Sequence, residues 1–186
     1  NKINIYTLDH SINYIFWIKH FFYWLWKSIR FRKYLKFLSF IKYILFFHID
    51  NNVHLKIKVG EKNNNLKNII KRLKINTNTT LLKIDIDGDE YKIIDEIKNY
   101  EFLGLIIEFE KLNKNIKKVE NFIKKNKNLK LIHIHGNNFS PVINNMPDSI
   151  ELSFVNKKLI HVVRKNETKY PMKNLDFPNN IMKSDI

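Results

Sequence analysis

Hydrophobic and polar positions are most sharply ordered between residues 81 and 97, which read LLKIDIDGDEYKIIDEI. The run at 81–86 is mostly apolar at its start and contains Lys83, a pattern typical of a short buried strand. Carboxylates then cluster around Gly88, and isoleucines recur at helical spacing in residues 93–97. An apolar run, an acidic glycine turn and an amphipathic helix together predict a parallel strand, its C-terminal loop and a crossover helix.

The same kind of patterning predicts elements on both sides of this unit. Alternation and short apolar runs predict strands, whereas i, i+3, i+4, i+7 spacing predicts helices. The expected strands are residues 3–8, 53–59, 105–109, 129–135, 150–155 and 159–163, and the expected helices are 66–73 and 116–123. Because only Asn156-Lys157-Lys158 separates the last two runs, we expect an antiparallel hairpin there. Helices that alternate with strands, followed by antiparallel strands, indicate an α/β fold with a mixed edge.

Residues 14–47 differ from the rest of the chain because aromatic and basic side chains are interleaved throughout them. Lys19 interrupts the most apolar part, so we do not expect a membrane-spanning helix, which needs about 20 mostly apolar residues. Two interpretations remain. In the first, which we favour, one or two helices cover a face of the sheet and their aromatic side chains form core. In the second, a helix lies in a membrane interface.

Composition changes this picture only in part. At 186 residues, with 44% hydrophobic and 13% aromatic residues, the chain is long enough for one domain with a real core. The formal charge of +15 fits an anionic partner, but we favour a lysine-covered surface as its explanation and expect no specific nucleic acid partner. The absence of cysteine excludes disulfides, a thiolate metal site and a catalytic thiol. The sequence starts at Asn1 rather than at methionine, and we expect it to be a fragment.

Polar residues gather where successive strands are expected to end. The three groups are Asp85, Asp87 and Glu90; Glu108 and Glu110; and His133, His135, Asn137 and Asn138. Because parallel strands end at the same edge of a sheet, these groups should meet there. A carboxylate beside a histidine can take a proton from a hydroxyl, and the same set of side chains could bind a divalent metal. His133 and His135 alternate with isoleucines, so both should project to one side of their strand.

Two further features bear on nucleotide binding. Asp9 follows the first expected strand, where a carboxylate can accept hydrogen bonds from ribose hydroxyls, although a lone aspartate there is more often a turn former or helix cap. Neither a dinucleotide-binding loop nor a P-loop nor a nucleophile elbow can be written around the few glycines. These glycines are Gly60, Gly88, Gly104 and Gly136.

The motif KIDIDGDEY at residues 83–91 resembles the K-I-D-x-E-G-x-E signature of FkbM-type methyltransferases. Three further stretches agree with that family in order and spacing. They are IYTLDHSI at 5–12, similar to a second-strand segment; IHIHGNN at 132–138 with Pro147 and IELSF at 150–154, similar to the C-terminal strand pair; and YP at 170–171 with LDFPNN at 175–180, similar to the tail.

The resemblance implies a doubly wound, Rossmann-like α/β methyltransferase sheet, mostly parallel with an antiparallel C-terminal strand. It implies a single domain over residues 1–186, with 13–50 as a helical insertion. The implied activity is S-adenosylmethionine-dependent methyl transfer to a hydroxyl of a sugar, a glycan or a small metabolite.

By this mapping Asp9 and Asp85 would bind the cofactor. The candidate catalytic residues are Asp85, Asp87, Glu90, His133 and His135, with the acidic turn favoured as the base. Glu108, Asn137 and Asn138 would contact the acceptor. A divalent metal stays an open alternative.

The chain also departs from the family. The first strand and its glycine-rich cofactor loop should precede Asn1, and Asp87 stands where the family has glutamate. The alternative hypothesis is therefore a non-catalytic relic or scaffold module that lacks the cofactor loop. Weak association with a membrane surface through residues 14–47 is compatible with either hypothesis. We expect a cytoplasmic protein, peripheral at the inner membrane face if the interfacial interpretation of 14–47 holds.

Overall fold

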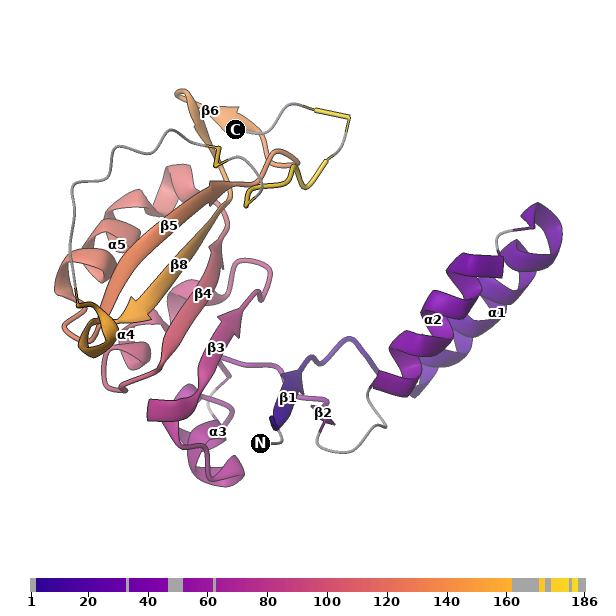
Figure 1. Ribbon diagram of the computed structural model, residues 1–186, viewed down its shortest axis with the longest axis horizontal. Helices are drawn as coiled ribbons and strands as arrows, with labels where there is room; N and C mark the ends of the chain where they lie inside the picture. Colours follow the sequence, from indigo (N-terminus) through magenta and orange to yellow (C-terminus); the bar gives the residue numbers. More distant parts are fainter. Residues whose placement is uncertain are drawn as a thin grey trace. The chain divides into compact units, whose positions relative to one another are not determined.

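The computed structural model describes residues 3–32, 34–46, 52–61, 63–161, 171–172, 175–180 and 182–183. Contacts within the chain divide it into two compact units, residues 1–64 and residues 65–186 (Figure 1). Each unit is described by itself. The prediction of a single domain with an insertion at 13–50 stays a prediction.

The first unit contains a pair of short parallel strands. Strand β1 (Ile5–Leu8) pairs with β2 (Asn52–Leu55), and the backbone N–H of Asp9 extends the ladder by donating to the Leu55 carbonyl over 3.2 Å. The strand predicted at 53–59 therefore stops early, because Ile57 N–H turns back to bind the Leu55 carbonyl at 2.8 Å. Between these two strands the chain makes a long helical excursion.

That excursion is a helical hairpin, formed by α1 (Tyr14–Phe31) and α2 (Tyr34–Phe46), which lie side by side (Figure 1). Asn13 caps α1 by accepting a hydrogen bond from the Phe16 N–H at 3.0 Å, and Arg32 ends the helix in a left-handed conformation. Of the described side chains in both helices, only Ser28 and Phe40 are buried. Within the first unit most of the aromatic side chains are therefore not buried, because two helices alone offer each other only one face. The prediction that these helices cover a face of the sheet stays a prediction.

The second unit is built on a sheet of four strands, in the order β3 (Leu81–Ile84), β4 (Gly104–Phe109), β8 (Ile150–Asn156) and β5 (Leu129–Gly136) (Figure 1). Strands β3 and β4 are parallel, whereas β8 is antiparallel to both β4 and β5. The α/β class is confirmed, but the expectation of a mostly parallel sheet is corrected to a mixed one. The antiparallel strand lies inside the sheet rather than at its edge.

The predicted hairpin between 150–155 and 159–163 does not form over the described residues. Both edges of β8 are occupied by β4 and β5, so no hydrogen-bonding edge is left for a further strand. The chain enters a 3₁₀ turn, η3 (Lys157–Leu159), directly after β8. Residues 162 and 163 lie outside the described part of the chain. A small hairpin occurs earlier, between β6 (Val142–Ile143) and β7 (Met146–Pro147).

The helices of the second unit follow the predicted periodicities. Helix α3 (Leu66–Leu73) is confirmed, and α5 (Leu112–Lys125) contains the predicted helix. The crossover after β3 is shorter than expected, because the chain makes 3₁₀ turns at η2 (Glu90–Lys92) before α4 (Ile94–Ile97). A further 3₁₀ turn, η1 (Thr77–Thr79), leads into β3.

The core of the second unit lies between one face of the main sheet and the helices α4 and α5 (Figure 1). The Phe122 ring of α5 packs edge-on against Phe154 at 5.6 Å and against Phe109 at 6.2 Å between ring centroids. The other fully buried side chains on these elements include Ile93, Ile97, Leu105, Ile107, Leu112 and Leu152. Because side chains alternate along a strand, the residues between these apolar positions face the other side of the sheet, where the polar groups lie.

Candidate carboxylate edge

The acidic turn after β3 is held by one carboxylate. Glu90 Oε1 accepts hydrogen bonds from the Gly88 N–H at 2.9 Å and from the Ile86 N–H at 3.4 Å. Asp87 takes a left-handed conformation with φ 53°, and Gly88 follows with φ 94°. The turn therefore reverses the chain within a few residues and leaves Asp85 and Asp87 exposed at the end of the strand.

The backbone conformation at residue 88 favours glycine. Its positive φ strains any residue with a side chain, and an added Cβ would lie 3.2 Å from Lys111 Nζ and 3.6 Å from Glu110 Oε2. The backbone of the turn thus passes close to the charged groups that follow β4.

Glu90 itself is fully buried, with no exposed surface. Among the described residues its Oε2 has no hydrogen-bond partner, and burial raises the pKa of Glu90 although the backbone N–H groups of Gly88 and Ile86 oppose that rise. A side chain sealed in this way shapes the turn rather than touching a ligand. The geometry therefore favours a positioning role for Glu90 over the predicted catalytic one.

The carboxylates of the two parallel strand ends gather at one edge, as predicted. Partial burial raises the pKa of Asp85, and the nearby Glu108 carboxylate raises it further, with smaller effects from Asp87 and Glu151. Lys83 opposes this rise. Asp85 therefore holds a proton more readily than an ordinary aspartate, which makes it a better base near neutral pH.

Glu108 is fixed by two neutral donors. Its Oε1 accepts hydrogen bonds from Asn137 Nδ2 at 2.7 Å and from Ser149 Oγ at 2.6 Å. Asn137 is fixed in turn, since its Oδ1 accepts from the Phe139 N–H at 2.9 Å. Glu108 and Asn137 are thus in direct contact with each other, and their role in binding an acceptor stays a prediction.

Glu110 completes the carboxylate group. Partial burial raises its pKa, as do Asp87, Glu108 and Asp85, while Lys111 opposes the rise. The Tyr91 hydroxyl donates a hydrogen bond to the Glu110 backbone carbonyl at 2.6 Å. We call Asp85, Asp87, Glu108, Glu110 and Glu151 the carboxylate edge.

Strand pairing extends this edge across the sheet. Glu108 on β4 lies opposite Glu151 on β8, and Glu151 lies opposite His135 on β5. Lys83 Nζ reaches Glu151 Oε2 at 3.3 Å and partly balances the row. The two histidines share one face, as predicted, because His133 lies opposite Ser153 in the same register.

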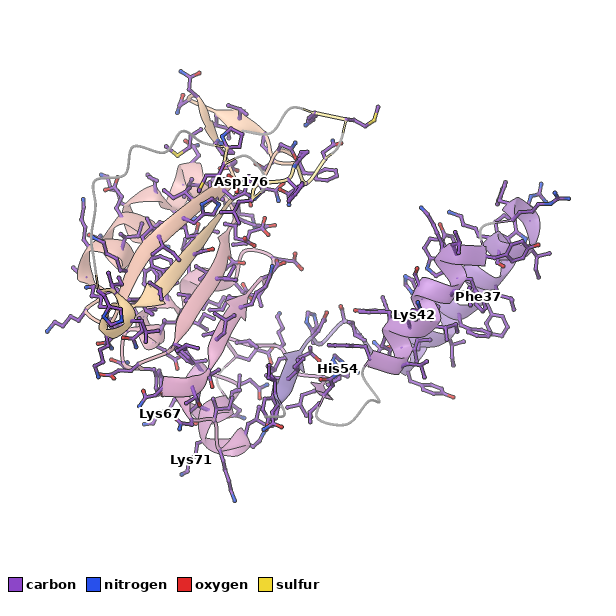
Figure 2. All side chains as sticks on the ribbon, in the orientation of Figure 1. Phe37, Lys42, His54, Lys67, Lys71 and Asp176 are labelled. Carbon is purple, nitrogen blue, oxygen red and sulfur yellow. The ribbon has the colours of Figure 1, made fainter. Side chains whose placement is uncertain are left out.

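The histidines nevertheless stand apart from Asp85, because β8 lies between β4 and β5. His133 is engaged by a residue from the tail: its Nε2 lies 2.7 Å from Asp176 Oδ1, and both side chains are largely buried (Figure 2). The Met172 N–H donates to the other oxygen of Asp176. The structure thus places His133 in a histidine–carboxylate pair rather than beside the acidic turn.

Asn138 anchors the same tail. Its Oδ1 accepts from the Asn180 N–H at 2.6 Å, and its Nδ2 lies 3.0 Å from the Asn180 carbonyl and 3.3 Å from the Lys183 carbonyl. The residue is buried, so its amide serves backbone groups of the tail. This arrangement favours a structural role over the predicted contact with an acceptor.

Asp9 belongs to the first unit. Its Oδ1 accepts two hydrogen bonds of 2.7 Å from Ser11, one from the N–H and one from the hydroxyl. Burial raises the pKa of Asp9, but these hydrogen bonds outweigh it and lower the pKa overall. This is the local turn-forming geometry expected of a lone aspartate after a strand, and the cofactor role stays a prediction.

No set of three or more histidine, aspartate and glutamate side chains within the described residues is arranged to hold a metal ion. The described helices also include none that is long and apolar enough to cross a membrane.

Comparisons with known proteins do not add a family. No family model matches the chain, and no curated protein or solved structure matches it.

Four residues of the site were not predicted from the sequence. Glu151 could have been found from the alternation in 150–155, had the antiparallel partner of 105–109 been known, and Ser149 immediately precedes that strand. Lys111 and Asp176 carry no such signal, because each reaches the site from a loop or from the tail.

Proposed function

We propose that this chain belongs to an S-adenosylmethionine-dependent O-methyltransferase that acts on a hydroxyl of a sugar, a glycan or a small metabolite. The observation that carries the proposal is the carboxylate edge, whose residues Asp85, Asp87, Glu108 and Glu110 lie at the C-terminal ends of two adjacent parallel strands. Ligands of open α/β sheets bind at such ends.

The direction of the strands also supports the proposal. The resemblance at residues 83–91 implies a sheet whose C-terminal strand is antiparallel. Of the four strands in the main sheet, β8 comes last along the chain, and it is antiparallel to both of its neighbours. Residues 83–91 form the end of β3 and the acidic turn. An α/β enzyme binds its ligand at this end of a parallel strand.

The chemistry of the edge fits the cofactor. S-adenosylmethionine carries a sulfonium cation and ribose hydroxyl groups, and carboxylates attract the former and accept hydrogen bonds from the latter. Asp85 and Glu110 are the residues of this edge that would hold it. When bound, the cofactor would supply an electrophilic methyl group.

Asp85 is the base in this proposal. Its carboxylate would accept the proton of the acceptor hydroxyl, whose oxygen would receive the methyl group that the bound cofactor supplies. The raised pKa of Asp85 favours the proton transfer. Asn137 and Ser149 hold the Glu108 carboxylate in position, and its negative charge helps to raise the pKa of Asp85. Glu90 fixes the backbone of the turn.

The experiment is calorimetric titration with S-adenosylmethionine and with S-adenosylhomocysteine, which lacks the sulfonium charge. It is made on the chain and on a version lengthened upstream along its reading frame. We expect tighter binding of the charged ligand, and Asp85→Asn should reduce that preference about fivefold, equivalent to ~1 kcal/mol.

The matched control is Asp95→Asn on α4, which makes the same chemical change at an exposed ion pair with Lys98 and should leave the preference unchanged. Failure of both forms of the chain to bind either ligand would overturn the proposal and leave the scaffold hypothesis. Binding without any preference for the charged ligand would remove the carboxylate edge from the cofactor site.

A further inference from the structure

The helical hairpin turns an apolar face outward. On α1, large apolar residues recur at i, i+3, i+7, i+11 and i+14, which places them on one side of a helix. This outer stripe consists of Ile15, Ile18, Phe22, Trp26 and Ile29, whose exposed fractions are 62, 41, 62, 51 and 68%. A water-exposed helix normally carries polar residues on such a side.

The outer stripe is what remains after the hairpin has packed. The opposite side of α1 faces α2, where the rings of Phe21 and Phe37 meet at 5.7 Å and those of Trp17 and Phe40 at 6.1 Å (Figure 2). Ser28 is buried on that same side. Helix α2 therefore covers one face of α1 and leaves the stripe open.

The charges of the hairpin have one sign. Residues 13–46 contain no aspartate or glutamate, and their cations are Lys19, Lys27, Arg30, Arg32, Lys33, Lys36 and Lys42. Two cations of α1 lie beside aromatic rings: Lys27 Nζ is 4.4 Å from the centroid of Tyr23, and the Arg30 guanidinium carbon is 5.6 Å from that of Trp26. Such side chains bury their stems against apolar surface and keep the charge at the water boundary.

We propose that α1 is a membrane-binding helix that lies in the plane of an anionic bilayer, with the outer stripe in the acyl boundary and its cations at the lipid phosphates. An apolar side with large aromatic and aliphatic residues, flanked only by basic residues, is the pattern of interfacial helices. Helix α1 has 18 residues and is about 27 Å long, and it is not apolar enough to cross the bilayer.

The charge and the side-chain types of this face favour an anionic bilayer over a second copy of the chain or a nucleic acid. A second copy of the same face would bring cations against cations without a single carboxylate to pair them. Single-stranded nucleic acid would need stacking rings at the contact, whereas Ile15, Ile18 and Ile29 make up most of the stripe. An anionic bilayer satisfies both the apolar side chains and the cations.

The first test is co-sedimentation of the chain with vesicles of phosphatidylglycerol and phosphatidylcholine, and with vesicles of phosphatidylcholine alone. We expect binding to the anionic vesicles and at least tenfold weaker binding to the neutral ones. The double variant Phe22→Ser, Ile29→Ser should lose at least tenfold in affinity for the anionic vesicles. The control is Leu35→Ser, Leu38→Ser, which removes exposed leucines of α2 and should keep the affinity.

The tryptophans give a second readout, because all three lie on α1 and only Trp26 belongs to the outer stripe. Anionic vesicles should shift the emission to shorter wavelength, and brominated lipids should quench it. Trp26→Phe should abolish most of this response, whereas Trp24→Phe should retain it. Helicity measured by circular dichroism shows that each variant is folded.

Several results would overturn the proposal. The first is equal binding of the wild type and the outer-stripe variant, and the second is equal loss with the α2 control. The third is shielding of Trp26 from acrylamide before vesicles are added, since another part of the chain would then cover the stripe. Binding to DNA that anionic vesicles do not displace would assign the cations to nucleic acid instead.

Discussion

The main sheet of the second unit and the helical hairpin of the first distribute their apolar side chains in opposite ways. In the sheet, Phe109 and Leu105 have no exposed surface and carboxylates occupy the other face. In the hairpin, Phe40 is the one buried hydrophobic side chain among the described residues, whereas Phe22 and Trp26 are more than half exposed. One face of the sheet and two helices enclose a core, but two helices alone bury only the seam between them.

The two regions therefore use their apolar side chains for different purposes. The second unit has the packing of a self-sufficient core and uses its polar face for the carboxylate edge. The hairpin has apolar surface in excess of what its own packing needs. Surface of that kind marks a site of interaction.

The largest effect is expected from the core of the sheet. Phe109→Ala should lower the free energy of unfolding of the second unit by about 3–5 kcal/mol, because it leaves a cavity beside Phe122. Urea unfolding followed by circular dichroism measures this. Phe22→Ala, at a site 62% exposed, should cost less than about 0.5 kcal/mol. Similar costs for both variants would contradict the comparison.

Within the hairpin, Phe40→Ala should be the costly change. Phe40 is 7% exposed and packs between Trp17 and His20, so its removal should cost about 2–4 kcal/mol of hairpin stability. Hydrogen exchange should accelerate in α1 and α2 and stay unchanged in β4 and β8. Leu35→Ala, at a site 80% exposed, is the control and should leave exchange unaltered. Acceleration in both units would show that they share one core.

A smaller effect is expected where the tail joins the sheet. Asp176→Asn removes the charge that His133 Nε2 meets at 2.7 Å in a largely buried contact, and should cost about 1–3 kcal/mol. Protease cleavage of the tail should become faster at the same time. Asp95→Asn makes the same substitution at an exposed ion pair and should cost less than about 0.5 kcal/mol. If the two variants behave alike, the His133–Asp176 contact contributes nothing to stability.

The smallest effect concerns the pH dependence of the acidic turn. Burial raises the pKa of Glu90 above its ordinary value of 4.5, so the folded chain binds this proton more tightly than the unfolded chain. The resulting stability is full below about pH 4.5 and is lost as the pH rises through the raised pKa. Glu90→Gln cannot ionise, so its free energy of unfolding should fall less steeply with pH than that of the wild type.

Urea unfolding between pH 4 and pH 8 measures this slope. Glu120→Gln on the exposed side of α5 is the control, since Glu120 pairs with Lys124 at the surface, and its curve should run parallel to the wild type. A Glu90→Gln curve that is also parallel would mean that Glu90 is not protonated more readily in the folded chain.

Local periodicity was sufficient for most of the elements. The spacing of Leu66, Ile69, Ile70 and Leu73 predicted α3, and the apolar run before Glu108 predicted β4, because burial of one side imposes its period on the sequence. The acidic turn was also predicted, since Gly88 between aspartates has few alternatives. The same local patterns predicted that Asp85 and Glu108 would end adjacent strands.

Pairing between distant segments could not be predicted in this way. The insertion of β8 between β4 and β5 is decided by which strands find a free edge, and no local pattern at 150–155 encodes its partners. That one choice brings Glu151 to the carboxylate edge and moves the histidines away from Asp85.

The sequence by itself determined most of the secondary structure of the sheet unit, the acidic turn and the single sign of the charges on the hairpin, because these depend on residues near one another in the chain. The tertiary structure decided which carboxylates share an edge, that Glu90 is sealed beneath its turn and that Asp176 meets His133. It also decided that the aromatic residues of α1 divide into a packed side and an exposed stripe, since burial depends on what the rest of the chain covers.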